Sequence, residues 1–392
     1  MTPEPSEPAP ALAGRTLLIA AQSGRALAQA ARRAGLAPLV LDLFGDADTR
    51  ALAEGYRQAE GRFGAGLLGG DAILRHLDIL AAEGPGEPLG LVLGSGFEAA
   101  PDLMRTIAGR HRLLGAGPDC VAALKDPFAL AALCRAQAVP HPAVTRDPVP
   151  DRSAWLLKRA GGSGGTHIRA APGGPAPPGA YFQARAPGRA VSLAVLADGA
   201  AIRVVGVTEQ WSAPSPLRPF RYAGALERAP HEPPVLGAEL LATMAAGVAC
   251  LAAATGLRGL ASADCLVDGR DWWLTEINPR PGATLDVLDR RRTPLLAQHI
   301  AASLGRLPDP EPAPMDAAAS EICYAASGYA PMPPISWPDF VRDRPRPGTT
   351  VARHAPLCTL FATGPDSAAT RAMLRSRAAE LRTLLALTEG HP

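Results

Sequence analysis

The chain has 392 residues, of which 47% are hydrophobic and 19% charged. Such a chain is long enough for two or three packed domains and too apolar for a disordered protein. Its formal net charge of +2 provides no basic surface for nucleic acid or an anionic membrane. The six cysteines contain no Cys-x-x-Cys pair, which favours reduced thiols in a cytosol over disulfides or a zinc site. We expect no secretory signal, because no basic segment followed by an apolar run opens the sequence.

Residues 1–13 are rich in Pro and Glu and predict a disordered tail. Beyond them, apolar runs at residues 16–20 and 38–43 flank a helical stretch at residues 24–34. This strand, helix, strand order predicts a parallel sheet with crossover helices. Residues 89–93 repeat the strand pattern before Gly94-Ser95-Gly96, and Phe97, Glu98 and Asp102 are predicted on the helix that follows. This α/β domain should end near residue 118.

Only two of the 39 basic residues are lysines, Lys125 and Lys158. A lysine is a compact point charge that reaches between phosphate oxygens, whereas the guanidinium fork of arginine is broad and planar. Lys125 is predicted at the head of a helix that reaches about residue 137. Lys158 ends a predicted strand at residues 155–158. In a chain that otherwise uses arginine, these two positions indicate phosphate binding.

A glycine-rich loop follows Lys158 directly and reads Arg-Ala-Gly-Gly-Ser-Gly-Gly-Thr over residues 159–166. Without Cβ atoms, its backbone N–H groups are able to approach phosphate oxygens closely. The loop matches neither the Walker pattern nor Gly-x-Gly-x-x-Gly, and flexible linkers have similar compositions. Its place after the strand that ends in Lys158 favours a phosphate clamp. We interpret His167, beside the loop, as a surface residue of a strand and not as an acid or base.

The middle of the chain predicts two strands at residues 191–197 and 201–207 around an Asp198-Gly199 turn. A Pro-rich loop with Arg218, Arg221 and Tyr222 follows, and loops of this length are usually functional or mobile. Residues 240–257 then carry no charge over 18 positions, close to the length of a membrane span. Their Ala-rich composition favours a buried helix.

Residues 264–282 predict a β-hairpin, because apolar runs at residues 265–267 and 272–277 flank a polar turn. Asp264 opens the first strand. Glu276 and Asn278, at i and i+2 near the end of the second, leave the same face of the sheet. Two carboxylates and an amide oxygen on one face are ligands that suit Mg²⁺. Arg280 follows on that face between two prolines.

Taken in order, these motifs resemble the ATP-grasp superfamily. The resemblance covers about residues 114–302 and rests on both lysines, the glycine loop, a Phe-Gln-x-x-x-x-Gly segment beginning at Phe182, and Glu276-Ile277-Asn278-Pro279-Arg280 with Asp264. It implies a mixed α/β and α+β fold. The expected parts are a tail at residues 1–13, a parallel-sheet α/β domain at 14–118, two α+β ATP-grasp subdomains at 119–180 and 181–310, and a small α+β cap at 311–392.

The resemblance also implies roles for individual residues. Lys125 and Lys158 would contact the phosphates of ATP, with Lys158 and Arg280 acting in catalysis. The residues implied to bind the nucleotide as a whole are Lys125, Lys158, Gly161, Gly162, Ser163, Gly164, Gly165, Phe182, Gln183, Ala184, Arg185 and Ser192. Mg²⁺, or alternatively Mn²⁺, would be held by Asp264, Glu276 and Asn278.

The sequence departs from the family pattern in the segment that contacts the ribose. Many members carry acids where this chain has Gln183 and Ala190, and Ser192 is the residue that would replace the second contact. Residues 259–264 and 276–286, with Thr208-Glu209-Gln210-Trp211, resemble ATP-dependent carboligases related to biotin carboxylase. These are linked to one-carbon metabolism that uses tetrahydromethanopterin and methanofuran.

The function implied is that of an ATP-dependent carboxylate-amine ligase, which forms an amide through an acyl phosphate and releases ADP and phosphate. Its partners would be a small carboxylic acid and an amine, without nucleic acid or membrane. A carboxylase that uses carboxyphosphate and a nucleotide-binding protein without activity remain open as alternatives. The sequence leaves the oligomeric state open, although homodimers are the commonest oligomers. Segment 343–348 in the cap reads as a turn.

Overall fold

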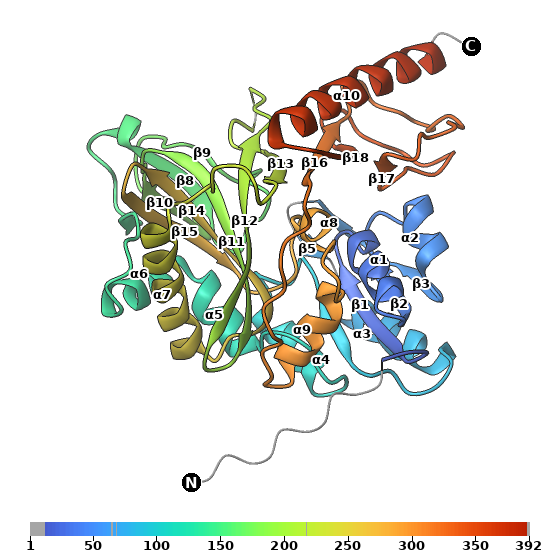
Figure 1. The fold of residues 1–392 in the computed structure, drawn as a ribbon, viewed down its shortest axis with the longest axis horizontal. Helices are drawn as coiled ribbons and strands as arrows, with labels where there is room; N and C mark the ends of the chain where they lie inside the picture. Colours follow the sequence, from blue (N-terminus) through green and yellow to red (C-terminus); the bar gives the residue numbers. More distant parts are fainter. Residues whose placement is uncertain (1–11, 64–65, 68, 217, 390–392) are drawn as a thin grey trace.

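The computed structural model describes residues 12–63, 66–67, 69–216 and 218–389 of the chain. Residues 1–11 of the predicted tail lie outside the described residues. Leu12, the first described residue, packs against the hydrophobic core that lies behind the N-terminal strands. The remaining chain forms the predicted combination of one parallel and several antiparallel sheets, with helices on their faces (Figure 1).

The N-terminal domain is built on four parallel strands in the order β3-β2-β1-β6, as the sequence pattern predicts. The strands are β1 (Thr16–Ala21), β2 (Ala37–Asp42), β3 (Gly55–Gln58) and β6 (Leu91–Leu93). The helices are α1 (Arg25–Arg33), α2 (Ala47–Leu52), α3 (Gly70–Glu83) and α4 (Pro101–Ala108), and a small ladder joins β4 (Gly61–Arg62) to β5 (Gly66–Leu67). Helix α4 begins later than predicted, so Glu98 lies in the turn that precedes it.

A smaller antiparallel sheet in the order β7-β10-β8-β9 follows. Its elements are α5 (Pro118–Lys125), α6 (Pro127–Ala136), β7 (Val144–Thr145), the 3-10 turn η1 (Arg152–Ala154), β8 (Trp155–Arg159), β9 (Arg169–Ala170) and β10 (Ala180–Ala184). Lys125 ends α5 and does not open α6, which corrects the prediction. The Asp126 side chain accepts hydrogen bonds from the first amides of α6, and Pro127 cannot continue α5.

The largest sheet has eight strands in the order β15-β14-β11-β12-β13-β16-β18-β17. They are β11 (Arg189–Asp198), β12 (Ile202–Ser212), β13 (Tyr222–Glu227), β14 (Arg258–Asp268), β15 (Asp271–Asn278), β16 (Ala317–Tyr324), β17 (Val341–Arg342) and β18 (Pro356–Gly364). Thr208 to Trp211 belong to β12, and β13 was not predicted. The C-terminal strands extend this sheet through β13 and do not form a separate one, and Val351 forms only an isolated bridge to Tyr329.

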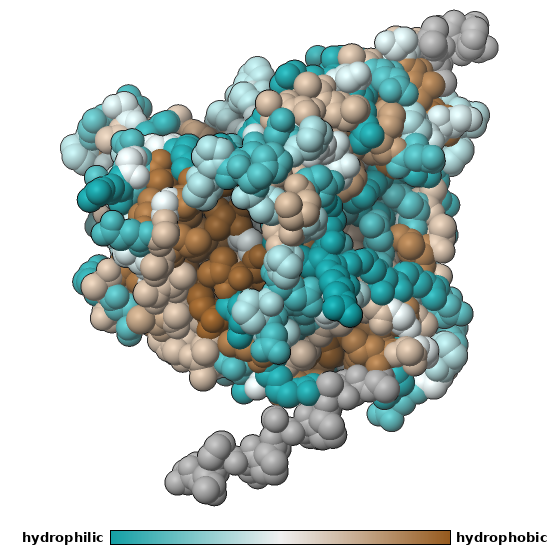
Figure 2. Space-filling model, in the orientation of Figure 1, coloured by the Kyte–Doolittle hydropathy of each residue, from teal (hydrophilic) through white to brown (hydrophobic). Residues whose placement is uncertain are grey.

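Helix α7 (Ala238–Thr255) contacts the large sheet along one stripe, in which Met244, Val248 and Leu251 are buried. The helix is therefore less buried than its composition predicts. In the part of the chain that the structure describes, it alone is long and apolar enough to cross a membrane by those two criteria. Figure 2 shows hydrophobic side chains gathered on this side of the molecule, where the ribbon has α7 beside β11 and β12.

Three more helices complete the chain: α8 (Leu285–Leu288), α9 (Leu295–Ser303) and α10 (Ser367–Glu389). Helix α9 joins the core beneath the N-terminal sheet, where His299 accepts a hydrogen bond from the amide of Leu260 at 2.8 Å. Helix α10 packs on β16 and β18 in the cap. Figure 1 shows the cap above the N-terminal domain.

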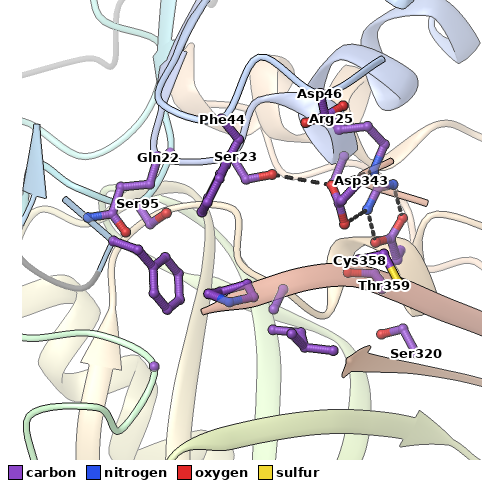
Figure 3. A pocket seen from close by; sticks show the side chains of 18 of the residues that line it. Gln22, Ser23, Arg25, Phe44, Asp46, Ser95, Ser320, Asp343, Cys358 and Thr359 are labelled. Atoms are coloured by element: carbon purple, nitrogen blue, oxygen red, sulfur yellow. Dashed lines mark hydrogen bonds and ion pairs between the residues drawn. The ribbon is translucent and has the colours of Figure 1, made fainter. Parts of the chain in front are cut away.

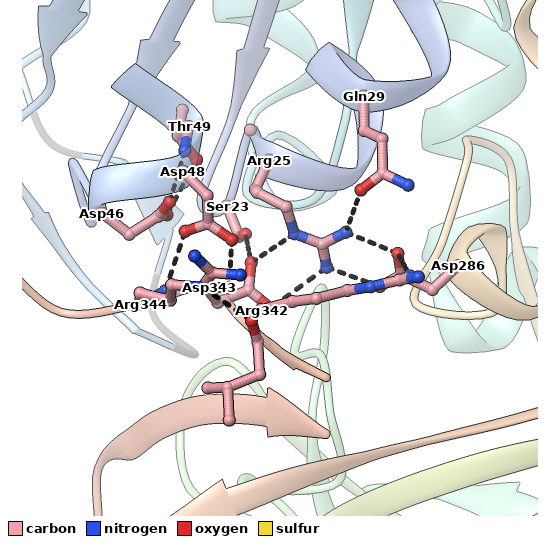
Figure 4. A network of polar contacts seen from close by, with 12 residues as sticks. Ser23, Arg25, Gln29, Asp46, Asp48, Thr49, Asp286, Arg342, Asp343 and Arg344 are labelled. Atoms are coloured by element: carbon pink, nitrogen blue, oxygen red, sulfur yellow. Dashed lines mark hydrogen bonds and ion pairs between the residues drawn. The ribbon is translucent and has the colours of Figure 1, made fainter. Parts of the chain in front are cut away.

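A network of charges joins the cap to the N-terminal domain (Figure 4). The buried guanidinium of Arg25 pairs with Asp286, which follows the hairpin, and with Asp343 of the cap at 3.0 Å. Arg342 also donates to Asp286 at 2.7 Å, and the amides of Asp343 and Arg344 donate to Asp48. The segment expected as a simple turn is therefore the contact that fixes the cap against the N-terminal domain.

We expect Asp286→Asn to destabilise the protein by about 3–5 kcal/mol at pH 7, because it leaves a buried guanidinium undercompensated. Burial alone would raise the pKa of Asp286, but Arg25 and Arg342 outweigh burial and hold this pKa below its ordinary value. A carboxyl with a lowered folded-state pKa stabilises the fold above its unfolded pKa of about 3.9 and loses this effect as the pH falls.

Urea denaturation of both proteins at pH 7 and pH 3 tests this expectation, because the difference between them should shrink in acid. Asp102→Asn is the matched control, since its pair with Arg105 is exposed and should leave stability nearly unchanged. Equal effects of the two substitutions at pH 7 would contradict the structural role of the network.

Candidate active site

The three predicted metal ligands converge at the end of the hairpin formed by β14 and β15. Asp264 and Glu276 are direct cross-strand partners, and Asn278 lies two residues further along β15. The Asn278 amide donates to one oxygen of Asp264 at 2.9 Å, and the Ser192 hydroxyl donates to the other at 2.7 Å. The hairpin predicted from the sequence therefore places both carboxylates and the amide on one face.

Lys125 reaches this face from the end of α5. Its ammonium group donates to Glu276 and to the side-chain oxygen of Asn278, the latter at 3.1 Å. Because α5 ends where the next helix is capped, the Lys125 side chain extends past the last turn toward the hairpin. This partly buried ion pair joins two segments that are 151 residues apart in the sequence.

Lys158 lies at the same place, buried at the end of β8. Burial lowers the pKa of Lys158, and the neighbouring charge of Lys125 lowers it further. For Glu276, burial alone would raise the pKa, but Lys125 and Lys158 outweigh burial and hold it below its ordinary value. The two lysines therefore share one carboxylate, and a ligand with several negative oxygens would complete the charge balance.

The glycine loop packs tightly on both sides, so its glycines are needed for close approach. Gly165 has φ +66°, and a Cβ there would lie 2.0 Å from the carbonyl oxygen of Phe220. At Gly161 a Cβ would lie 2.6 Å from the Ala99 side chain of the N-terminal domain. The loop is held between the N-terminal domain and the large sheet, next to both lysines.

A cavity of about 30 Å³ lies between the glycine loop and the hairpin. The predicted site residues that line it are Lys125, Lys158, Gly161, Gly162, Gln183 and Glu276. His141 and His167 line it as well, which the sequence analysis did not predict. The residues predicted to bind phosphates and the Glu276 carboxylate of the hairpin thus line one cavity.

Comparison with known proteins finds a family for the part of the chain that contains these residues. Residues 126–284 match the family model of the ATP-grasp domain. The chain contains an ATP-grasp domain. No curated protein matches the sequence.

Solved structures extend the likeness of fold to almost the whole chain. Biotin carboxylase from Campylobacter jejuni has a TM-score of 0.70 at 15% identity, over 92% of this chain and 90% of that one. The biotin carboxylase domain of 2-oxoglutarate carboxylase from Hydrogenobacter thermophilus has a TM-score of 0.67 at 12% identity, over 90% and 86%. N5-carboxyaminoimidazole synthetase from Staphylococcus aureus has a TM-score of 0.65 at 14% identity, over 93% and 97%. The predicted fold class is confirmed.

The segment expected to contact adenine in this ATP-grasp domain is β10 and the residues after it. Phe182 and Gln183 are buried and pair with β7 on one side and β8 on the other. The amide of Ala184 donates to Ala143 and that of Arg185 to Ala154, each at 2.8 Å. These two amides are therefore used within the protein, so recognition of adenine by this segment would depend on its other backbone groups.

Arg280 has a partner that the sequence analysis did not assign to the site. Its guanidinium pairs with Glu98 of the N-terminal domain at 2.7 Å. Burial alone would raise the pKa of Glu98, but Arg280 and Lys125 hold it below its ordinary value. The spacing of 182 residues between the partners leaves no local signal from which the pair could be predicted.

The two histidines beside the lysines correct the interpretation of His167. It lies in the turn after the glycine loop and not on a strand. Its imidazole packs against Gly162 so closely that a Cβ added to Gly162 would lie 2.3 Å from the ring. Burial and neighbouring Lys158 lower the pKa of His141 to about 4. Burial likewise lowers the pKa of His167 to about 4. Both imidazoles are therefore neutral at pH 7 and line the cavity between the glycine loop and the hairpin as uncharged groups.

The donor set on the hairpin fits a hard divalent cation. Among the described residues no group of three or more His, Cys, Asp and Glu side chains is close enough to hold a metal. The hairpin instead offers two carboxylates and the oxygen of Asn278. Burial raises the pKa of Asp264, and the charge of Glu276 raises it further, so a cation placed between the two carboxylates would relieve their repulsion.

We expect Gly165→Ala to weaken binding of an ATP analogue by at least about tenfold, or about 1.4 kcal/mol, because the loop must move away from Phe220. Gly174→Ala is the control, since Gly174 also has a positive φ but a Cβ added there would meet no atom within 4 Å. Isothermal titration calorimetry measures both affinities. Similar losses in the two variants would show that backbone strain alone, and not the packed position of the loop, causes the effect.

Proposed function

We propose that this protein is an ATP-dependent carboxylate-amine ligase, which forms an amide through an acyl-phosphate intermediate. The observation that carries the proposal is the cluster of buried Lys125, Lys158 and Asn278 with partly exposed Glu276 beside the glycine loop. It supplies cations for a triphosphate and oxygens for a metal at one point. The ATP-grasp domain supports ATP as the phosphoryl donor.

A carboxylate needs activation before an amine can attack it, because oxide is a poor leaving group. In the first step a carboxylate oxygen bonds to the γ-phosphorus of ATP, and the bond to ADP breaks. Lys125 and Lys158 neutralise the phosphates, and Arg280 stabilises the phosphoryl group as it moves. Asp264, Glu276 and Asn278 would hold Mg²⁺ or Mn²⁺, which supplies further charge neutralisation on the phosphates.

In the second step the amine nitrogen bonds to the acyl carbon, and the bond to phosphate breaks. The amine loses a proton, and phosphate leaves with the bonding electrons. The chain's contribution is to hold the two substrates in contact and to exclude water, since water would hydrolyse the acyl phosphate. This role agrees with the burial of the site residues.

The second candidate function is a carboxylase that forms carboxyphosphate from bicarbonate. The solved structures favour it, because they include a biotin carboxylase and a carboxylase domain whose complex holds ADP, magnesium and bicarbonate. Dependence on bicarbonate and on a biotinyl or amine acceptor would distinguish this activity. A role in the synthesis of a one-carbon carrier cofactor is supported only by the motif resemblance.

We also propose a cytoplasmic location and a homodimer. The described cysteines are all free thiols, which supports a reducing compartment. One of the similar solved structures is a domain dimer, which supports the homodimer.

The test is release of ADP by the purified protein with Mg-ATP and a matrix of small acids and amines that includes glutamate, tyramine and bicarbonate. We expect turnover to require both an acid and an amine. Glu276→Gln should lower turnover by about 100-fold or more while ATP binding remains measurable, because a metal ligand is lost and the fold is kept. Asp271→Asn, an exposed position on the same hairpin, is the control.

Each outcome separates the candidates. ADP release with bicarbonate alone would favour the carboxylase. ATP binding without turnover on any pair would favour a nucleotide-binding protein without activity. Full turnover by Glu276→Gln would overturn the metal assignment.

A further inference from the structure

A cavity of about 270 Å³ lies between the N-terminal domain, the glycine loop and the cap (Figure 3). The glycine loop separates it from the smaller cavity that Lys125, Lys158 and Glu276 line. Gly161 and Gly162 line the smaller cavity, whereas Ser163 and Gly164 line the larger one. Arg280 also lines the larger cavity, so a molecule bound there reaches the group that we place on the transferred phosphoryl.

Two loops of the N-terminal sheet and the cap strands both contribute hydrogen-bonding groups to this cavity. Ser23 follows β1, and Ser95 follows β6, at the carboxyl ends of adjacent parallel strands. Ligands of open α/β sheets bind at this edge. Figure 3 shows both serines, with Gln22 and Phe44, on the side opposite Ser320, Cys358 and Thr359 of the cap.

Much of the remaining wall is apolar. Phe44 and Phe63 of the N-terminal domain pack against each other with ring centroids 5.8 Å apart. The cap contributes apolar side chains to the same cavity, among them Ile322, Pro345 and Leu357. A wall of this kind gains free energy by burying an aromatic or branched aliphatic group.

Most of the charged side chains that line the cavity are paired with an opposite charge within the protein. Arg25 pairs with Asp286 and Asp343, and Arg280 pairs with Glu98. Two further charged residues are also engaged: Arg346 donates to the carbonyl of Gly45 at 2.8 Å, and Asp46 accepts from the amide of Thr49 at 2.7 Å.

Because most of these charges are already paired, they limit the charged groups that a bound ligand is able to pair with. Neither of the chain's two lysines lines the cavity. A phosphate group binds where several cationic donors are available. Of the three arginines that line this cavity, Arg25 and Arg280 are paired with carboxylates, and Arg346, which donates to a neutral carbonyl, is a single cation. The cavity therefore disfavours a phosphorylated ligand.

We propose that this cavity binds the amine substrate, and that this amine carries an aromatic or branched aliphatic body and no phosphate. The proposal rests on the ligase function proposed above. The reacting nitrogen of the amine is directed toward Arg280, and the apolar body of the amine lies between Phe44 and the cap. Apolar surroundings also favour the uncharged form of an amine, which is the nucleophile in the second step.

The test compares four amines: benzylamine, 3-methylbutylamine, ethanolamine and phosphoethanolamine. Binding is measured by saturation-transfer NMR without ATP, and the apparent KM of each amine is measured by ADP release. We expect benzylamine and 3-methylbutylamine to bind at least about tenfold more tightly than the two polar amines.

Two substitutions place this binding in the cavity. Phe44→Ala should weaken benzylamine binding by about tenfold, and Thr350→Trp should obstruct the cavity from a position that is exposed and tolerates a large side chain. Ile79→Ala, an exposed apolar residue on α3 outside the cavity, should leave binding unchanged.

The NMR readout separates the two proposals, because it does not require turnover. Selective binding of benzylamine that Phe44→Ala and Thr350→Trp weaken would support the cavity assignment even if no amine released ADP, an outcome that would count against the ligase. Equal binding of phosphoethanolamine, unchanged binding in Phe44→Ala, or no binding of any amine would overturn the cavity assignment.

Discussion

The partly buried ion pair between Lys125 and Glu276 is the interaction on which the candidate site depends. It joins the end of α5 to the hairpin of β14 and β15, and it brings Asn278 and Lys158 into the same cluster. Because 30% of the Glu276 side chain is exposed, solvent screens part of this attraction. When ATP and a metal ion bind, contacts with phosphates and a cation would replace part of the contact between these two side chains. Structure and chemistry therefore use the same side chains.

Arginine and lysine have separate tasks in this chain. Arg25 lies in a buried network that fixes the cap to the N-terminal domain, and Arg291 pairs with Glu227 in the large sheet. These planar forks donate to two or more acceptors at once, which suits permanent contacts between elements. The two lysines instead line the small cavity beside the glycine loop. A compact charge with rotatable donors there suits the reversible binding of phosphates that we propose. The unusual ratio of 37 arginines to two lysines thus has a structural counterpart.

The fold is shared with carboxylases and with N5-carboxyaminoimidazole synthetase, so the fold by itself does not select the reaction. The proposed acceptor lies in the space next to Arg280. In this chain that space is bounded by Phe44, by the serines of two N-terminal loops and by cap strands that continue the large sheet. The paired charges and the apolar wall favour an uncharged, apolar-bodied acceptor. The cap is consequently part of the proposed substrate site, because its strands form one wall of the cavity.

The sequence by itself determined the features that depend on neighbouring residues. Period-two alternation and a polar turn predicted the hairpin and put Glu276 and Asn278 on one face, and the place of the glycines after Lys158 predicted the loop. The end of α5 at Lys125, where Asp126 caps the next helix, was not predicted. The helical residue pattern continues from α5 into α6 without a visible break. The tertiary structure decided the pair of Glu98 with Arg280, the position of His167 in a cavity beside Glu276, strand β13 and the cavity beneath the cap. Each of these depends on contacts between segments far apart in the chain, and such contacts leave no periodic signal in the sequence.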